Sequence, residues 1–169
     1  FHKLPEPQID WQAKAVKDAL VRPVSIISGG PGTGKTYTVA RLLLALQAVN
    51  DTSLTIAMAA PTGKAKQRLV ESIIDAKKQL SRQGIDATLI NSIPETAHTL
   101  HGLLGLRPNS HGAKHHRDNP LAIDLLLVDE VSMVDLSMMS RLLDALPEHC
   151  KLVLVGDAEQ LPSVAAGSI

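Results

Sequence analysis

The sequence predicts an α/β domain built on a doubly wound parallel sheet with helices on both faces. Two observations carry this prediction. Four apolar runs, at residues 24–28, 54–59, 124–128 and 151–155, are short and nearly continuous, as strands are in a parallel sheet covered on both sides. Helical patterns separate the runs, and strands that alternate with helices form parallel sheets.

The helices are predicted from the spacing of apolar residues and from the residues that end them. Residues 12–20 precede the first strand, and residues 35–49 carry an apolar stripe with helical spacing. Residues 63–80 form a longer amphipathic segment. Residues 136–146 repeat the pattern and stop at Pro147, which cannot continue a helix.

Two regions interrupt this alternation. Residues 81–94 form a polar connection that contains a glycine and a proline. Residues 107–120 are rich in Gly, Pro, Asn and His, which predicts an exposed loop. The loop histidines lack a cysteine or an acidic pair at ligand spacing, so a surface loop is favoured over a metal site. These histidines are His111, His115 and His116.

Composition and charge limit the class of protein. The 169 residues fit one domain, and 44% hydrophobic with 20% charged side chains is ordinary for a soluble protein. Basic and acidic residues balance at 17 each, so any contact with nucleic acid is local. The single cysteine, Cys150, suits a reducing compartment, and no apolar run approaches the ~18 residues of a membrane span. We expect a cytoplasmic protein that contacts no membrane, and a chain that is a piece of a longer one.

A phosphate-binding loop follows the first apolar run. The stretch GGPGTGKT spells G-x-x-x-x-G-K-[ST] and opens a predicted helix, the context that this motif requires. Its glycines let the backbone turn tightly, so that several N–H groups and the helix dipole bind an anion. Lys35 is expected to reach the β- and γ-phosphates, and the Thr36 hydroxyl to ligate Mg²⁺. The predicted nucleotide-binding residues are Gly29, Gly30, Pro31, Gly32, Thr33, Gly34, Lys35 and Thr36.

Two adjacent acids complete the predicted hydrolase site. Asp129 and Glu130 follow the apolar run at 124–128, and parallel sheets bind ligands at the carboxyl ends of their strands. Asp129 suits the outer shell of Mg²⁺. Glu130 suits the polarisation of an attacking water, because phosphoryl transfer needs an oriented nucleophile. A G domain would need an NKxD stretch and a small-metabolite kinase an arginine-rich lid, and the sequence has neither.

Three further blocks distinguish among nucleotide hydrolases. Residues 60–69, APTGKAKQRL, place a turn and three cations at a helix start, which suits a grip on a phosphodiester backbone, although alone it more often marks a solvated basic helix. Residues 96–105, TAHTLHGLLG, place Thr99 and His101 on a short helix or turn. Residues 152–164, LVLVGDAEQLPSV, place a polar loop after the last strand. Their order along the chain resolves what each block leaves ambiguous.

The ordered blocks resemble the first motor domain of superfamily 1 DNA helicases, and among these the RecD-type helicases of bacterial RecBCD complexes (exodeoxyribonuclease V). The resemblance covers nearly the whole chain and rests on GGPGTGKT, APTGK, TLHGLLG, VDEVSM and VGDAEQLPSV together with Gln12. It implies one RecA-like P-loop NTPase domain over residues 1–169, with a second motor domain elsewhere in the parent. It also implies ATP and Mg²⁺ as cofactors, 5′→3′ movement on single-stranded DNA, and RecB- and RecC-like partners in recombination and double-strand-break repair.

The resemblance also implies roles for single residues. Gln12 would select adenine. Lys35, Glu130 and Gln160 would serve catalysis. Gln160 would sense the γ-phosphate, because its strand lies between the two nucleotide-binding strands in such folds. Tyr37 is a further candidate for the adenine face, on its place beside the loop alone. The implied DNA contacts are Pro61, Thr62, Gly63, Lys64, Thr99 and His101.

Two alternatives to a DNA motor stay open from the sequence: an ATP-regulated switch or clamp-loading module that binds proteins, and a remnant without turnover. The arginine fingers of such helicases belong to the second motor domain, so the 169 residues alone are expected to hydrolyse nucleotide almost undetectably. No acid cluster with two-metal nuclease spacing indicates that this domain cuts DNA. With aromatic residues at 2%, DNA contacts are expected at phosphates and sugars, sensitive to salt and nearly indifferent to base sequence.

Overall fold

A parallel sheet forms the centre of the computed structural model, which describes residues 24–28, 35–49, 53–106 and 112–156. The strands run in the order β1-β5-β4-β2-β3, and every neighbouring pair is parallel. In that order they are β1 (Val24–Ser28), β5 (Lys151–Gly156), β4 (Leu125–Val128), β2 (Ile56–Ala60) and β3 (His98–Thr99). The strand that precedes Gln160 in the chain therefore lies between β1 and β4, as the resemblance to helicases implied.

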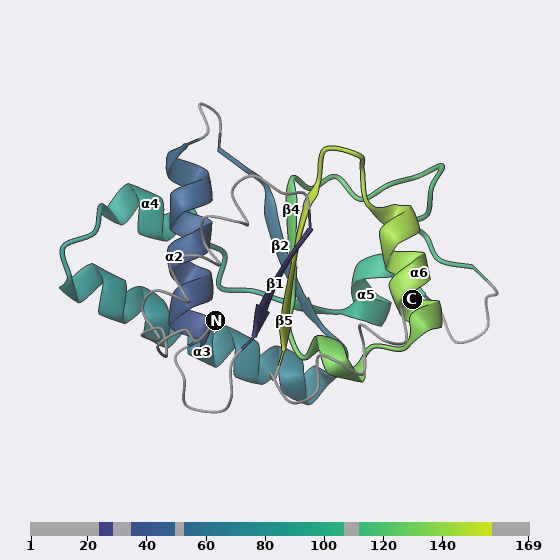
Figure 1. The fold of residues 1–169 in the computed structure, drawn as a ribbon, viewed down its shortest axis with the longest axis horizontal. Coiled ribbons are helices and arrows are strands. Elements are labelled where there is room, and N and C mark those ends of the chain that lie inside the picture. The colour runs from purple at the N-terminus through teal and green to yellow at the C-terminus, as the bar shows by residue number, and fades with distance from the viewer. Residues whose placement is uncertain (1–23, 29–34, 50–52, 107–111, 157–169) are drawn as a thin grey trace, which may run out of the picture.

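Helices cover both faces of the sheet (Figure 1). On one side lie α2 (Lys35–Ala48), α3 (Gly63–Arg82) and α4 (Ala87–Asn91), and on the other side lie α5 (Leu100–Leu104) and α6 (Leu136–Ala145). A short 3-10 helix, η1 (Val131–Met133), follows β4. The predicted α/β class with a doubly wound parallel sheet is confirmed. Among the described residues, no helix has the length and apolar character needed to span a lipid bilayer.

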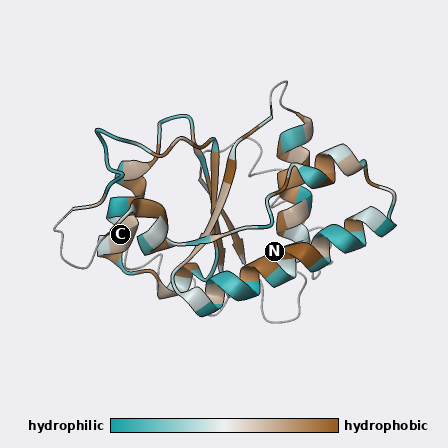
Figure 2. Ribbon diagram, turned by 180° about the vertical axis from the view of Figure 1, so that it is seen from behind, coloured by the Kyte–Doolittle hydropathy of each residue, from teal (hydrophilic) through white to brown (hydrophobic). Residues whose placement is uncertain are grey.

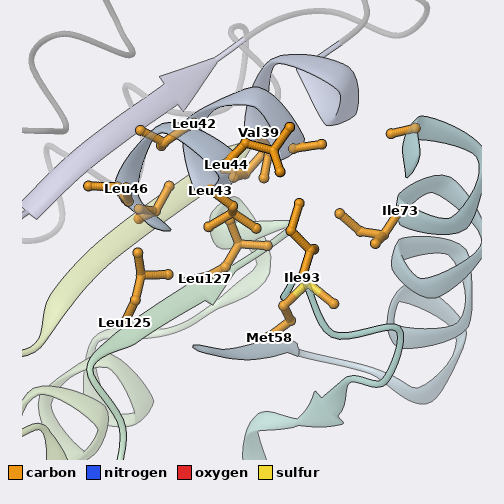
Figure 3. Close-up of a cluster of buried hydrophobic side chains, with 14 of the residues drawn as sticks. Val39, Leu42, Leu43, Leu44, Leu46, Met58, Ile73, Ile93, Leu125 and Leu127 are labelled. Atoms are coloured by element: carbon orange, nitrogen blue, oxygen red, sulfur yellow. The ribbon is translucent and has the colours of Figure 1, made fainter. Parts of the chain in front are cut away.

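Apolar side chains fill the space between the sheet and each helical layer. Leu125 and Leu127 of β4 face the leucines of α2, in the cluster that Figure 3 shows. Leu126 and Val128 belong to the second cluster, with α5 and α6. All four residues of β4 are 0% exposed, and successive side chains of a strand point to opposite faces. This double burial explains why the strand is a continuous apolar run, and Figure 2 shows the strands as largely hydrophobic.

The second strand begins later than predicted, at Ile56 rather than at residue 54. The Leu54 amide donates to Gln47 Oε1 at 2.9 Å, and the Thr55 amide donates to Asp124 Oδ2 at 2.8 Å. Because side chains satisfy these two amides, the strand ladder starts only after them. The other predicted strands and helices that the structure describes agree with it to within two residues. The predicted helix over residues 12–20 lies outside the described residues.

The connection predicted over residues 81–94 is wrong in one respect, because it contains the helix α4. Asp86 caps this helix, since its Oδ1 accepts a hydrogen bond from the Thr88 amide at 3.0 Å. With five residues, α4 is too short to show a helical periodicity in the sequence. β3 was also missed, because two residues, His98 and Thr99, form no apolar run.

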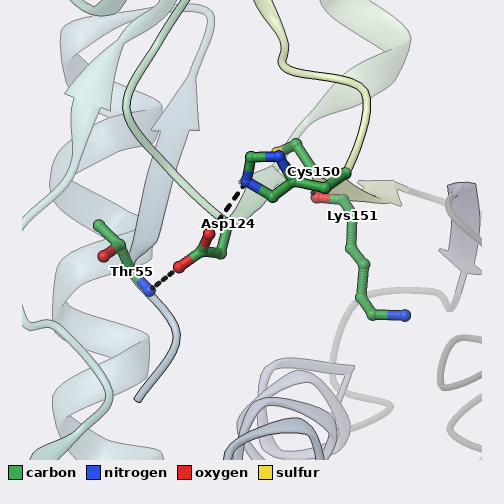
Figure 4. Close-up of polar contacts among 5 residues, drawn as sticks. Thr55, Asp124, Cys150 and Lys151 are labelled. Carbon is green, nitrogen blue, oxygen red and sulfur yellow. Dashed lines mark hydrogen bonds and ion pairs between the residues drawn. The ribbon is translucent and has the colours of Figure 1, made fainter. Parts of the chain in front are cut away.

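An aspartate joins the amino ends of three strands (Figure 4). Asp124 accepts the Thr55 amide before β2 and lies 3.1 Å from His149 Nε2, and its carbonyl accepts the Lys151 amide of β5 at 3.0 Å. Cys150 is buried beside this cluster. Burial, and next the charge of Asp124, raises the pKa of the Cys150 thiol to about 11, so the thiol stays protonated and unreactive at neutral pH.

The loop predicted over residues 107–120 is exposed over most of its described part, residues 112–120. It is held at Gly105, the C-cap of α5, whose φ of 72° is left-handed. A Cβ at this glycine would lie 2.5 Å from the Lys114 Cβ. The αL conformation and the close approach together require glycine here.

Replacing Gly105 by alanine is therefore expected to lower the free energy of unfolding by about 3 kcal/mol, from left-handed strain plus overpacking. Gly84→Ala is the matched control, because Gly84 has φ of 82° but open space around the added Cβ. That variant is expected to lose only about 1 kcal/mol. Urea unfolding of both variants measures the difference. Equal losses would show that the contact with Lys114 contributes nothing.

Candidate nucleotide and DNA site

Most of the predicted functional residues that the structure describes lie where the strands have their carboxyl ends. Lys35 follows β1 through the loop, Asp129 follows β4, and Thr62 follows β2. Thr99 ends β3, in register with Ala60 of β2. Among the described residues, the predicted nucleotide residues follow β1 and β4, and the predicted DNA residues lie toward β2 and β3. Parallel sheets bind ligands at this edge.

Thr36 and Asp129 face the same small hollow. Its other walls are Val39, Leu69, Leu127 and Val155, and its volume is about 10 Å³, close to that of one water-sized particle. A hydroxyl and a carboxylate are the hard oxygen donors that Mg²⁺ prefers. Thr36 therefore fits its predicted role as a Mg²⁺ ligand, and Asp129 fits its predicted place in the outer shell of the ion.

The Asp129 carboxylate is held in a partly desolvated place. Burial, and to a smaller extent the charge of Glu130, raises the pKa of Asp129. Together they outweigh the hydrogen bond from the Glu130 amide and the charges of Lys35 and Arg68, which lower that pKa. The Glu130 amide donates to Asp129 Oδ1 at 2.9 Å, and the Asp129 amide donates to the Ala59 carbonyl at 2.9 Å. A cation beside this carboxylate would offset the cost of its burial.

Glu130 has an unusual backbone. Its φ of 55° and ψ of 42° are left-handed, and it is the one residue other than glycine with positive φ among those that the structure describes. This conformation costs a residue with a Cβ roughly 1–2 kcal/mol, and such strain is found mostly at functional sites. The turn starts η1, because the Glu130 carbonyl accepts the Met133 amide at 3.0 Å.

Two predicted DNA-binding threonines are helix caps. Thr62 Oγ1 accepts the Ala65 amide of α3 at 3.1 Å, and Thr99 Oγ1 accepts the Gly102 amide of α5 at 3.0 Å. Each hydroxyl keeps its own proton, so each can still donate to a phosphate oxygen. The caps hold both hydroxyls at fixed positions near the carboxyl ends of the neighbouring strands β2 and β3.

The other predicted DNA residues lie around these caps. Gly63 and Lys64 are exposed in the first turn of α3, Pro61 is half-buried before it, and His101 is exposed on α5. The first amides of any helix point out of its amino end, and the amino end of α3 lies at this edge of the sheet. A backbone phosphate can therefore meet amides, hydroxyls and one ammonium group here.

Tyr37 has contacts that sequence reasoning did not foresee. Its hydroxyl donates to Gln83 Oε1 at 2.7 Å, and the Arg41 guanidinium carbon lies 5.9 Å from the centre of its ring. Tyr37 thus ties α2 to the end of α3. Its proposed contact with adenine stays a prediction.

Sequence reasoning counted Arg68 as one of the three cations in residues 60–69, but it missed the contact of Arg68 with Glu130. Its Nη2 lies 3.8 Å from Glu130 Oε1. The two residues are far apart in the chain, and no local pattern indicates the pair. Some predicted nucleotide residues lie outside the described part of the chain: Gln12, the loop at 29–34, and Gln160.

Comparisons with known proteins show which family and which relatives the chain resembles. The family model of the AAA domain matches residues 12–166. The chain is 49% identical over 168 residues to the RecBCD enzyme subunit RecD of Haemophilus influenzae. The matched region covers 98% of this chain and 26% of that protein. It is 35% identical over 156 residues to the ATP-dependent RecD2 DNA helicase of Deinococcus radiodurans. That match covers 92% of this chain and 18% of the relative. The chain thus spans about a quarter or less of the length of these two relatives.

Two solved structures share the fold. T4 UvsW superposes with a TM-score of 0.58 at 14% identity, over 94% of this chain and 30% of that one. The HK97 bacteriophage large terminase gives a TM-score of 0.54 at 17% identity, over 92% and 33%. At such identities the likeness concerns the fold alone.

Proposed function

This chain belongs to the AAA-domain family, and from that premise we propose that it is the ATP-dependent motor domain of a RecD-type DNA helicase. One observation carries the proposal. Among the described residues, those predicted for nucleotide and those predicted for DNA lie at the carboxyl ends of the strands, and the two groups adjoin where β4 lies beside β2. Adjacent strands are about 4.8 Å apart, so the two proposed ligand sites are direct neighbours.

The residues divide the chemistry of hydrolysis among them. Lys35 neutralises charge that develops on the transferred phosphoryl group, and Glu130 orients the attacking water and accepts its proton. Thr36 and Asp129 would hold Mg²⁺, which supplies further neutralisation of phosphate charge when it is bound. Gln12 selects adenine and Gln160 reports the γ-phosphate under this proposal.

The DNA strand would cross the ends of β2 and β3. The hydroxyls of Thr62 and Thr99 donate to phosphate oxygens, and the helix start at Gly63 offers amides with a positive dipole end. Lys64 adds a charge, and His101 lies at the margin of the track. None of these contacts reads a base, so binding weakens with salt and shows little sequence preference.

The proposal extends to the parent protein. We propose that residues 1–169 form one RecA-like domain, that a second motor domain completes the ATP site, and that the parent works in the cytoplasm with RecB- and RecC-like subunits. Two relatives support these partners by their names as RecBCD subunits, at 49% and 48% identity. The expected direction of movement is 5′→3′ on single-stranded DNA.

ATP turnover by the full-length protein, with and without short single-stranded DNA, tests the proposal. DNA is expected to stimulate turnover strongly. Lys35→Gln is expected to lower the stimulated kcat by about 10²–10³-fold, as the loss of a charged transition-state partner does elsewhere. Turnover that ignores DNA would refute the motor and favour a switch that acts on proteins. If the unmodified protein shows no ATP turnover with or without DNA, the alternative of a remnant domain without hydrolysis is favoured.

A further inference from the structure

A buried lysine lies on the inward face of α3, and the chemistry proposed above does not use it. Lys77 is 7% exposed, and its ammonium donates to the Ile93 carbonyl at 2.8 Å and lies 2.8 Å from Glu95 Oε2. Lysine is almost never buried without such partners, because the removal of its charge from water is costly. Both contacts reach one short segment, residues 93–95, which lies between α4 and β3.

The segment that Lys77 holds leads into β3, the outermost strand of the sheet on that side. β3 pairs with β2 at only two positions, His98 with Ala59 and Thr99 with Ala60. A strand with so few ladder contacts is held weakly by the sheet alone. The contacts of Lys77, together with the buried Ile93 side chain in the cluster of Figure 3, fix the chain just before this strand.

α3 thereby connects two of the proposed DNA contacts. Thr62 caps the start of α3, and Lys77 of the same helix holds the approach to Thr99. Thr99 Oγ1 accepts the Gly102 amide, so the place of this hydroxyl depends on the place of β3. One helix therefore constrains where both hydroxyls lie, and a binding surface that is already ordered loses less free energy when its ligand binds.

The ion pair between Lys77 and Glu95 is not explained by stability alone. The Glu95 side chain is 51% exposed, so its carboxylate would be well hydrated without the lysine. Replacement of a buried ion pair by apolar side chains is often neutral or stabilising, and the best attested use of such pairs is to fix one arrangement of two segments. Here the two segments are α3 and the approach to β3.

We propose that Lys77 is a positioning residue that holds Thr99 in place for its contact with single-stranded DNA. This inference rests on the proposed function, because that function assigns Thr99 to the DNA. Lys77 acts through residues 93–97 rather than by contact with DNA or nucleotide. Without its ammonium, β3 is held less firmly, and the DNA must order Thr99 when it binds. The cost falls on DNA affinity and leaves the rate of hydrolysis unchanged.

The test uses the full-length protein and Lys77→Met, which keeps an unbranched apolar side chain in the buried place. The concentration of short single-stranded DNA that half-maximally stimulates ATP turnover is expected to rise about fivefold, the factor of one hydrogen bond. Turnover without DNA and kcat at saturating DNA are expected to stay within about twofold. Lys78→Met is the matched control, because it makes the same change at the next, exposed position of α3. Its DNA affinity is expected to stay within about twofold of the unmodified value.

Two further readouts separate positioning from a general structural role. In a Thr99→Val protein, Lys77→Met is expected to change the DNA affinity by less than about twofold, because the hydroxyl that it positions is gone. Amide hydrogen exchange in the Lys77→Met protein is expected to be faster over residues 98–102 and unchanged in β4 and β5. If Lys77→Met does not fold, Glu95→Ala takes its place, because Glu95 is half exposed, and the expected loss of DNA affinity is about threefold.

The outcomes distinguish this inference from the proposed function. If DNA stimulates the unmodified protein and Lys77→Met leaves its DNA affinity within about twofold, the positioning role is overturned and the motor stands. A fall of turnover without DNA that matches the loss of affinity, or faster exchange throughout the sheet, also overturns the positioning role. If the unmodified protein ignores DNA, the motor and the positioning role are both overturned. A loss of affinity that disappears in the Thr99→Val protein supports the inference.

Discussion

Changing Glu130 to glutamine is expected to lower kcat for ATP hydrolysis by the full-length protein about 10²–10⁴-fold, with nucleotide affinity nearly unchanged. Glutamine keeps the size of the side chain but cannot accept the proton of the attacking water. The backbone amide that caps Asp129 remains, so the metal-ligand side of the site keeps its geometry. Single-turnover hydrolysis with saturating DNA measures the step directly.

Glu148→Gln provides the control for this variant. Glu148 is exposed, and it lies just before β5, at the amino edge of the sheet. The same chemical change there is expected to leave kcat within about twofold, since exposed charges contribute little at a distance. A Glu130→Gln protein that retained more than about a tenth of the rate would assign the proton acceptor to another group.

Changing Asp129 to asparagine is expected to stabilise the nucleotide-free fold at neutral pH while it removes Mg²⁺-dependent turnover. Burial raises the pKa of Asp129 above its ordinary value of 3.8, so the folded state disfavours the charged carboxylate. Asparagine carries no charge, and its Oδ1 can still accept the Glu130 amide. The loss of a hard oxygen anion at the metal is expected to lower kcat by about 10²-fold or more.

The sign of the pH dependence makes this prediction specific. Because the folded pKa is raised, the group favours the fold fully below pH 3.8, and that contribution is lost as pH rises through the folded pKa. The stability advantage of Asp129→Asn should therefore be present at pH 7 and should vanish as pH falls toward 3.8. Asp75→Asn, an exposed change on α3, should show no such trend. Melting temperatures across pH measure both, and an advantage that grew at low pH would contradict the assignment.

The sequence predicted the sheet well because burial on both faces marks the chain directly. Runs such as residues 124–128 must be apolar throughout, and few other structures require that. The same logic fails for β3, which has two residues and ends in the cap of α5. It fails for α4 too, because one helical turn of mixed residues has no periodicity to detect.

The site was predictable where a local stretch carries the chemistry, and hidden where the fold brings distant residues together. Thr62 before Gly63 is a recognisable cap signal, and Asp129 with Glu130 follows a readable strand. The contact between Arg68 and Glu130 depends on how α3 is placed relative to the end of β4, and no local stretch of the sequence predicts that placement. The left-handed backbone at Glu130 could not be predicted either, since a glutamate does not indicate a positive φ.

The cluster around Asp124 leaves the two edges of the sheet free to change independently. Asp124 and Asp129 flank β4 on opposite sides, five residues and roughly 16 Å apart along the strand. Mutational effects usually add without coupling beyond about 10 Å. Substitutions at the turn around Thr55, Asp124 and His149 are therefore expected to change the free energy of unfolding without coupling to substitutions at the candidate site.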